Sequence, residues 1–323
     1  MKRILKVIGI LIMVVLLGAA VGLSYVSFAL PDVGPAPELK VASNPAMVAR
    51  GQYLANHVAV CIDCHSTRDW SLYSGPPKTG TFGQGGEIFD QNMGFPGKYF
   101  APNITPEGIG HWTDGEIYRA ITCGVAKDGR ALFSIMPHIA YGKMSMEDAT
   151  AIVAYIRALQ PIKQEVPVSE SDFPMNFIIN TIPQKANHQP IPAKSDTLKY
   201  GEYMITMAAC KDCHTRMEKG SYIEGMEYAG NMEFKMPNGV LRSANITPDK
   251  ATGIGNWSKQ AFISRFKMYQ DAANIAKVDG KSMNSIMPWT MYAGMTEEDL
   301  GAIYSYLQSL KPIQQEVVKF SPH

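Results

Sequence analysis

The feature that most constrains this chain is an internal repeat in which each copy carries a Cys-x-x-Cys-His segment, at residues 61–65 and 210–214. The copies also share segments before and after these motifs, in the same order. The paired segments are 51–54 and 201–204, 103–106 and 245–248, 108–112 and 253–257, 134–137 and 285–288, and 151–156 and 302–307. Because only two copies are present, the pattern predicts two tandem domains rather than a long solenoid.

Cys-x-x-Cys-His is the attachment signature of c-type haem. The two thiols add to the porphyrin vinyl groups, and the adjacent histidine faces the iron as proximal ligand. A zinc site would need four ligands at a regular spacing, and a thioredoxin-like pair would need a βαβ context. We therefore expect two covalently bound haem c groups. The predicted attachment residues are Cys61, Cys64 and His65 for the first group and Cys210, Cys213 and His214 for the second.

The sixth iron ligand is expected to be a methionine in each copy. Met136 and Met287 lie in matching Ser-Ile-Met-Pro segments, at nearly the same distance after the attachment histidine. A thioether ligand raises the reduction potential, and the following proline would help to hold an irregular loop against the ring. Met144 and Met295 form a rival matched pair, but they lie beside predicted helix starts, where they more naturally pack in the core.

The remaining chemistry-bearing residues have simpler interpretations. We expect packing or surface roles for the unmatched histidines and a buried apolar role for the fifth cysteine. The paired tryptophans could touch haem edges or belong to the core, and the paired asparagines could cap turns or hold propionates. These residues are His57, His111, His138, Cys123, Trp112, Trp257, Asn103 and Asn245.

The local patterns predict a mainly α chain with long loops. Proline at position 45 suits a helix start, and Ser/Thr-x-x-Asp/Glu boxes at 113–116, 145–148 and 296–299 predict further starts. Prolines concentrate between 161 and 196, which predicts an extended linker. The expected organisation is an anchor (1–30), a tether (31–44), domain 1 (45–160), a linker (161–196), domain 2 (197–317) and a tail (318–323).

The N-terminal segment predicts membrane attachment. Three basic residues before position 7 precede an uncharged run to position 30, which as a helix would span about 36 Å and could cross a bilayer. The charge asymmetry places the haem domains on the outer side of a bacterial cytoplasmic membrane. The alternative is a cleaved signal peptide, for which Val26-Ser27-Phe28-Ala29 offers only a mediocre cleavage site.

The net charge of +1 argues against nucleic-acid binding, which usually requires a marked basic excess.

With its Asn-Ile-Thr-Pro, Gly-Ile-Gly-x-Trp and Met-Pro segments and its closing helices, the chain resembles the cytochrome c subunits of membrane-bound alcohol and gluconate dehydrogenases over about residues 45–317. The resemblance implies the class I cytochrome c fold and His/Met iron. It also implies electron relay from a periplasmic dehydrogenase to the quinone pool or an oxidase. Those subunits usually carry three haem sites, whereas this chain has two, so it would also suit a respiratory complex such as a terminal oxidase.

Three functions follow from these expectations. The first is a non-catalytic, two-haem electron carrier in a periplasmic-side respiratory chain, between a dehydrogenase or quinol-oxidising complex and an acceptor such as an oxidase or another cytochrome. The second is a diheme cytochrome c peroxidase, which needs one haem with an open distal side. The third is an assembly subunit whose haems serve mainly in folding. The matching Met-Pro segments favour the carrier, because they give both irons a sixth ligand.

Overall fold

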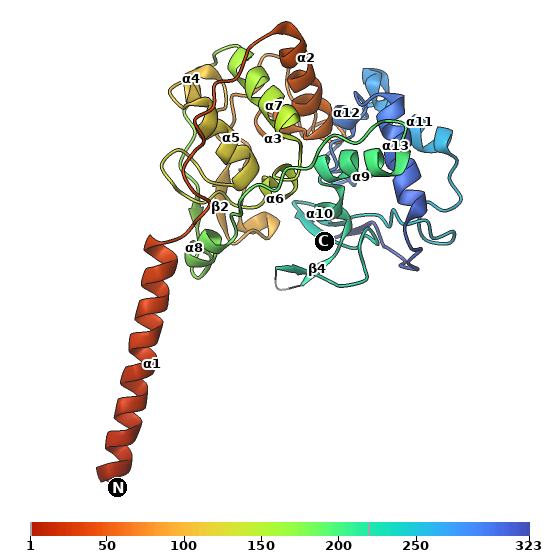
Figure 1. Cartoon of the computed structure of the whole chain (residues 1–323). Helices are drawn as coiled ribbons and strands as arrows, with labels where there is room; N and C mark the ends of the chain where they lie inside the picture. The colour runs from red at the N-terminus through yellow and green to blue at the C-terminus, as the bar shows by residue number, and fades with distance from the viewer. Residues whose placement is uncertain (1, 219) are drawn as a thin grey trace.

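The computed structural model describes residues 2–218 and 220–323 (Figure 1). Helix α1 (Lys2–Phe28) projects from a two-part head and buries none of its residues. It is long and apolar enough to cross a membrane, a test that a signal sequence near the N-terminus also passes.

The first half of the head, residues 45–160, is built from short helices around a pair of longer ones. Helix α2 begins at Pro45 behind the cap Asn44, and Thr113 forms a full capping box with Glu116, as the sequence predicts. The helices are α2 (Pro45–Tyr53), the π-helical turn η1 (Leu54–Val58), α3 (Cys61–Cys64), α4 (Pro106–Ile109), α5 (Asp114–Cys123), α6 (His138–Tyr141) and α7 (Met146–Ala158).

The second half, residues 197–317, repeats this arrangement. Its closing helix begins behind Thr296, whose side chain accepts the Asp299 N–H, just as Ser145 accepts the Asp148 N–H in the first half. The predicted starts of both closing helices are therefore confirmed. The helices are α9 (Thr197–Met207), α10 (Cys210–His214), α11 (Lys259–Lys267), the 3₁₀ turns η4 (Met268–Gln270) and η5 (Ala272–Asn274), α12 (Trp289–Tyr292) and α13 (Glu297–Ser309).

In each half the first and last long helices cross at a glycine. A Cβ on Gly51 would lie 1.8 Å from the Ala151 carbonyl oxygen, and one on Gly201 would lie 2.1 Å from that of Ala302. Only glycine allows this close approach, which explains why the Gly-x-Tyr segments of the repeat begin with it.

We expect Gly201→Ala to lower the free energy of unfolding by about 3 kcal/mol, the cost of overpacking a tight contact. Helix propensity alone predicts the opposite sign, a gain of about 1 kcal/mol. Denaturant unfolding distinguishes the two, with Glu202→Ala at the next, exposed position as the control. A more stable Gly201→Ala protein would show that the two helices do not cross this closely.

Short strands occupy the loops and the segments outside the two halves. In the first half, β1 (Ile88–Phe89), the turn η2 (Gln91–Met93) and β2 (Gly97–Phe100) lie in the long loop, and β2 pairs with β3 of the linker (Glu170–Ser171). The linker also contains α8 (Met175–Ile178) and η3 (Ile179–Thr181), so it is more ordered than an extended tether. In the second half, β4 (Met217–Glu218) pairs with β5 (Ser221–Tyr222).

The segment expected as a C-terminal tail joins a sheet. Strand β8 (Phe320–Pro322) pairs antiparallel with β7 (Gly239–Arg242), which pairs with β6 (Glu233–Met236). Backbone pairing over this long sequence separation leaves no local pattern for sequence analysis to detect.

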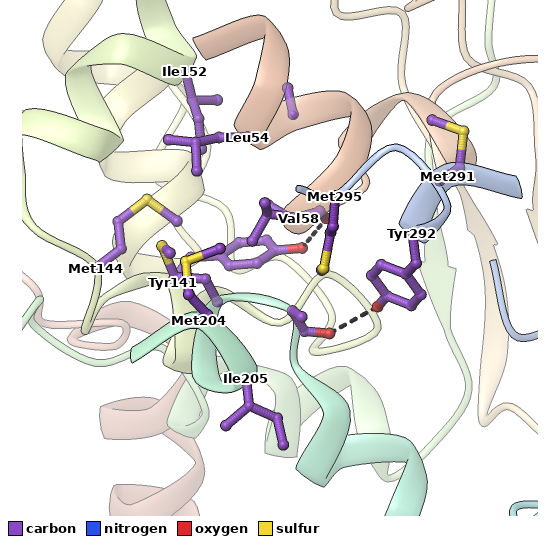
Figure 2. Packing of buried hydrophobic residues seen from close by; sticks show 14 of the residues in the cluster. Leu54, Val58, Tyr141, Met144, Ile152, Met204, Ile205, Met291, Tyr292 and Met295 are labelled. Carbon is purple, nitrogen blue, oxygen red and sulfur yellow. Dashed lines mark hydrogen bonds between the residues drawn. The ribbon is translucent and has the colours of Figure 1, made fainter. Parts of the chain in front are cut away.

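One apolar cluster runs through both halves (Figure 2). Leu54 and Val58 of the first half and Met204 and Leu300 of the second are 0 % exposed. The halves therefore share a core instead of meeting through a wet interface.

Two tyrosines, one from each half, form hydrogen bonds with the closing helix of the other half. The Tyr203 hydroxyl donates to Asp148 Oδ2 at 2.7 Å and accepts the Ser145 N–H at 3.0 Å. In mirror fashion, the Tyr53 hydroxyl donates to Asp299 and accepts the Thr296 N–H. Each half therefore supplies a hydrogen-bond partner to the first turn of the other half's closing helix.

Candidate haem-binding sites

Each Cys-x-x-Cys-His segment follows a strained turn. Val60 and Ala209, directly before the first cysteines, have φ values of 46° and 50°. A β-branched residue in the left-handed region is a true outlier, so its surroundings must hold it there. The carbonyl before each turn accepts a hydrogen bond from a tyrosine hydroxyl. Tyr141 donates to the Ala59 carbonyl at 2.6 Å, and Tyr292 donates to the Ala208 carbonyl at 2.8 Å. Figure 2 shows both tyrosines.

The four motif cysteines form no disulfide, and burial raises the pKa of Cys61, Cys64 and Cys210 to about 12. Within residues 2–218 and 220–323, no cluster of three or more His, Cys, Asp or Glu side chains could hold a metal ion. This arrangement disfavours zinc and leaves the thiols available for covalent attachment.

The two attachment histidines are oriented in the same way. His65 Nδ1 lies 2.8 Å from the Pro102 carbonyl oxygen, and His214 Nδ1 lies 2.7 Å from that of Ala244. Burial lowers the pKa of both imidazoles, which favours their neutral form. A carbonyl bonded to Nδ1 fixes the tautomer with Nε2 free to bind a metal, as is usual for ligating histidines.

The repeated Asn-Ile-Thr-Pro segments explain how those carbonyls are placed. Asn103 Oδ1 accepts the Thr105 N–H at 3.0 Å and its hydroxyl at 2.7 Å, while Nδ2 donates to the Ile162 carbonyl at 2.8 Å. Asn245 makes the equivalent bonds to Thr247 and Ile313. Both asparagines thus cap turns, as one of the two interpretations held, and each turn follows the carbonyl that orients a histidine.

The two candidate methionine ligands lie in matching turns. Met136 and Met287 are half-buried against the apolar cluster, and their carbonyls accept the N–H two residues later, at 2.7 Å and 2.8 Å. The intervening proline fits such an inverse γ-turn. The rival residues Met144 and Met295 are 1 % and 2 % exposed. They pack in the core, as the sequence analysis expects of residues beside helix starts.

Of the remaining histidines, His111 is exposed and His57 Nδ1 lies 2.9 Å from the Met291 carbonyl of the other half. Cys123 is buried, in line with its expected apolar role.

His138 lies two residues after Met136. It is buried, and burial lowers its pKa to about 4, while the nearby Leu132 backbone acts in the opposite direction.

Comparison with known proteins identifies one part of the chain directly. The cytochrome c family model matches residues 199–311. Over these residues the chain is therefore similar to cytochrome c. That family carries covalently bound haem c, and the residues present here fit it. Two thiols can add to the porphyrin vinyl groups, and an oriented imidazole and a thioether are side chains that can bind iron.

Most of the chain resembles cytochrome c subunits of dehydrogenases, as the sequence motifs suggest. It is 26 % identical over 287 residues to the cytochrome c subunit of a quinone alcohol dehydrogenase from Gluconacetobacter polyoxogenes, covering 84 % of this chain and 57 % of that protein. It is 26 % identical to the gluconate 2-dehydrogenase cytochrome c subunit of Pantoea cypripedii, covering 83 % and 60 %. A diheme cytochrome c-type protein of Cereibacter sphaeroides is 24 % identical, covering 79 % and 83 %.

The chain therefore spans about three fifths of the length of the dehydrogenase subunits it matches. The match to the diheme protein covers most of both chains. The family match and these relatives all bear the name cytochrome c.

Sequence analysis did not single out Arg68 or Ser74, which follow the first attachment motif and are both buried. The position equivalent to Arg68 in the second copy is Met217. Departure from the repeat is therefore the one sequence signal that could have drawn attention to this loop.

Proposed function

We propose that the chain is a membrane-anchored, two-haem cytochrome c that relays electrons between a dehydrogenase or quinol-oxidising complex and a terminal acceptor such as an oxidase. The observation that carries the proposal is the matched geometry of the two halves. Each has a strained turn, two free thiols, a histidine with Nδ1 bonded to a carbonyl, and a Met-Pro turn.

In this proposal each residue has a distinct task. Cys61 and Cys64 hold one haem covalently and Cys210 and Cys213 hold the other. The iron ligands are His65 with Met136 in the first half and His214 with Met287 in the second. When bound, each haem supplies one-electron exchange at its iron, while the protein sets its potential and excludes water. Two ligands on each iron leave no position for substrate, which supports a carrier, and no comparison supports a peroxidase.

We further propose that α1 is retained as the anchor, with the head on the periplasmic side. Helix α1 lies against the linker, and Asn180 Nδ2 donates to the Val26 carbonyl at 3.2 Å, so the helix makes a specific contact with the head (Figure 1). Anchoring raises the effective concentration of the carrier at membrane complexes.

The test is a redox titration of the full chain in lipid nanodiscs, after its haem content and intact mass are measured. We expect two covalent haems, a mass that retains residues 2–28, low-spin spectra with a methionine–iron band, and reduction by a quinol-linked or dehydrogenase donor. A high-spin haem that turns over peroxide would contradict the carrier function. A mass without the N-terminal segment would contradict the anchor alone.

A further inference from the structure

The loop that leaves the first attachment motif does not stay in its own half. Residues 68–75, here termed the strap, lie against residues 276–289 of the second half. The Tyr73 N–H donates to the Ala276 carbonyl at 2.8 Å, and the Val278 N–H donates to the Ser71 carbonyl at 2.8 Å. The strap is thus hydrogen-bonded to the segment that leads into the Met287 turn.

Ser74 is where the strap reaches that turn. Its hydroxyl donates to the Met287 carbonyl at 2.6 Å and accepts the Trp289 N–H at 3.0 Å. Its own N–H donates to Asn284 Oδ1 at 2.9 Å. One hydroxyl therefore bridges the two ends of the Met-Pro turn.

The conformation of Ser74 argues that this hydroxyl matters. The residue is 0 % exposed and has a φ of 69°, in the left-handed region where glycine is the ordinary choice. A serine there costs backbone strain that glycine would avoid, and it persists where surrounding contacts over-determine it. The contacts that glycine would lose are the two bonds to the Met287 turn.

At its other end the strap is tied to the first attachment motif through Arg68. Its Nε donates to the Gly75 carbonyl at 2.7 Å and its Nη2 to the Ser74 carbonyl at 2.7 Å. Its Nη1 lies 3.1 Å from Asp63 Oδ2, between the first two motif cysteines, and both side chains are at most 5 % exposed. A buried ion pair therefore continues into the hydrogen bonds that hold the Met287 turn.

The first attachment loop is hydrogen-bonded to the methionine turn of the second half, but among the residues that the structure describes the second attachment loop makes no such bonds to the methionine turn of the first half. Asp212, the counterpart of Asp63, accepts the Tyr222 hydroxyl at 2.6 Å within its own half. Across the described part of the chain, no hydrogen bond joins residues 210–230 to the Met136 turn at 133–138. The halves thus differ in how their methionine turns are held.

We propose that Ser74 is a positioning residue for the iron ligand of the other half: it fixes the Met287 turn from the first attachment loop and so sets the potential of the second haem. The inference rests on the proposed function, in which Met287 is that ligand. Haem potential depends on the axial ligand and its surroundings, so a shift of the turn is read out directly.

The test is a redox titration of the full, haem-loaded chain with Ser74→Ala and Ser74→Gly, the second of which also relieves the φ strain. We expect the equilibrium constant for reduction of the second haem to change at least threefold, about 28 mV at 59 mV per tenfold. Its methionine–iron band should shift, while the first haem stays within that limit. Ser71→Ala is the matched control, because its exposed hydroxyl bonds only Asp69 within the strap.

Hydrogen exchange at the Trp289 amide adds a readout independent of redox chemistry, with faster exchange expected in both Ser74 variants. Unchanged second-haem potentials in folded Ser74 variants would overturn the inference, and so would equal shifts at both haems. If Ser74→Ala does not accumulate, Ser74→Gly decides. A wild-type protein lacking two methionine-bound haems would instead overturn the proposed function.

Discussion

Replacing Cys210 and Cys213 together by alanine is expected to halve the covalent haem content, from two groups per chain to one. Without the thiols, only the bonds from His214 and Met287 to iron would hold the second haem, and these do not survive denaturation. The measurement is a pyridine haemochrome assay on denatured, purified protein, normalised to chain concentration. The reciprocal change of Cys61 and Cys64 should give the same ratio.

The control for this experiment is Cys123→Ala, which removes the one cysteine outside the motifs and should leave both haems in place. Because the halves share a core, a double substitution could destabilise the whole head. Cys210→Ala alone keeps one thioether bond and provides a milder variant. Two full equivalents of covalent haem in a chain lacking both thiols of one motif would contradict the assignment.

Replacing Met287 by histidine is expected to lower the potential of the second haem by a few hundred millivolts, within the range of about 0.8 V that axial ligands span. A thioether ligand raises the potential relative to a second imidazole, so the sign is fixed by ligand chemistry. The methionine–iron band should lose about half its intensity. Met136→His should act in the same way on the first haem, so the two variants also assign the potentials.

Met295→Leu is the matched control, because Met295 is 2 % exposed and packs in the core. It should cost less than about 1.5 kcal/mol of stability and leave both potentials unchanged, as a volume-conserving substitution does. The axial role would be disproved if Met287→His left the second potential in place while a substitution of Met295 moved it.

Much of the fold follows from local signals. The capping residues Thr113, Ser145 and Thr296 start the helices that the sequence predicts, because a cap depends on residues within one turn. The repeat shows that Gly51 and Gly201 are equivalent. The reason for a glycine at both positions, a close contact with the closing helix, is visible only in the structure. The shared core and the pairing of strand β8 are long-range contacts, which local patterns do not encode.

In the candidate sites, too, local features are predictable from the sequence and long-range contacts are not. Haem attachment is a five-residue signal, so the motifs alone predict it. The orientation of His65 depends on the Pro102 carbonyl, which the Asn103 turn places far along the chain. The role of Ser74 could not be predicted for a further reason. Its hydrogen bonds are to the other half, and the repeat has no equivalent serine, so neither periodicity nor duplication indicates it.

The crossed tyrosines bear on how the gene arose. Tyr53 binds the cap of the second closing helix and Tyr203 binds that of the first, so the same pair of positions is used twice, once in each direction. Such reciprocity defines the isologous contact of a twofold homodimer. A single ancestral domain carrying both the tyrosine and the Ser/Thr-Asp cap would have bound a second copy of itself through these contacts. Fusion of two such genes would have preserved the interface and freed each copy to diverge.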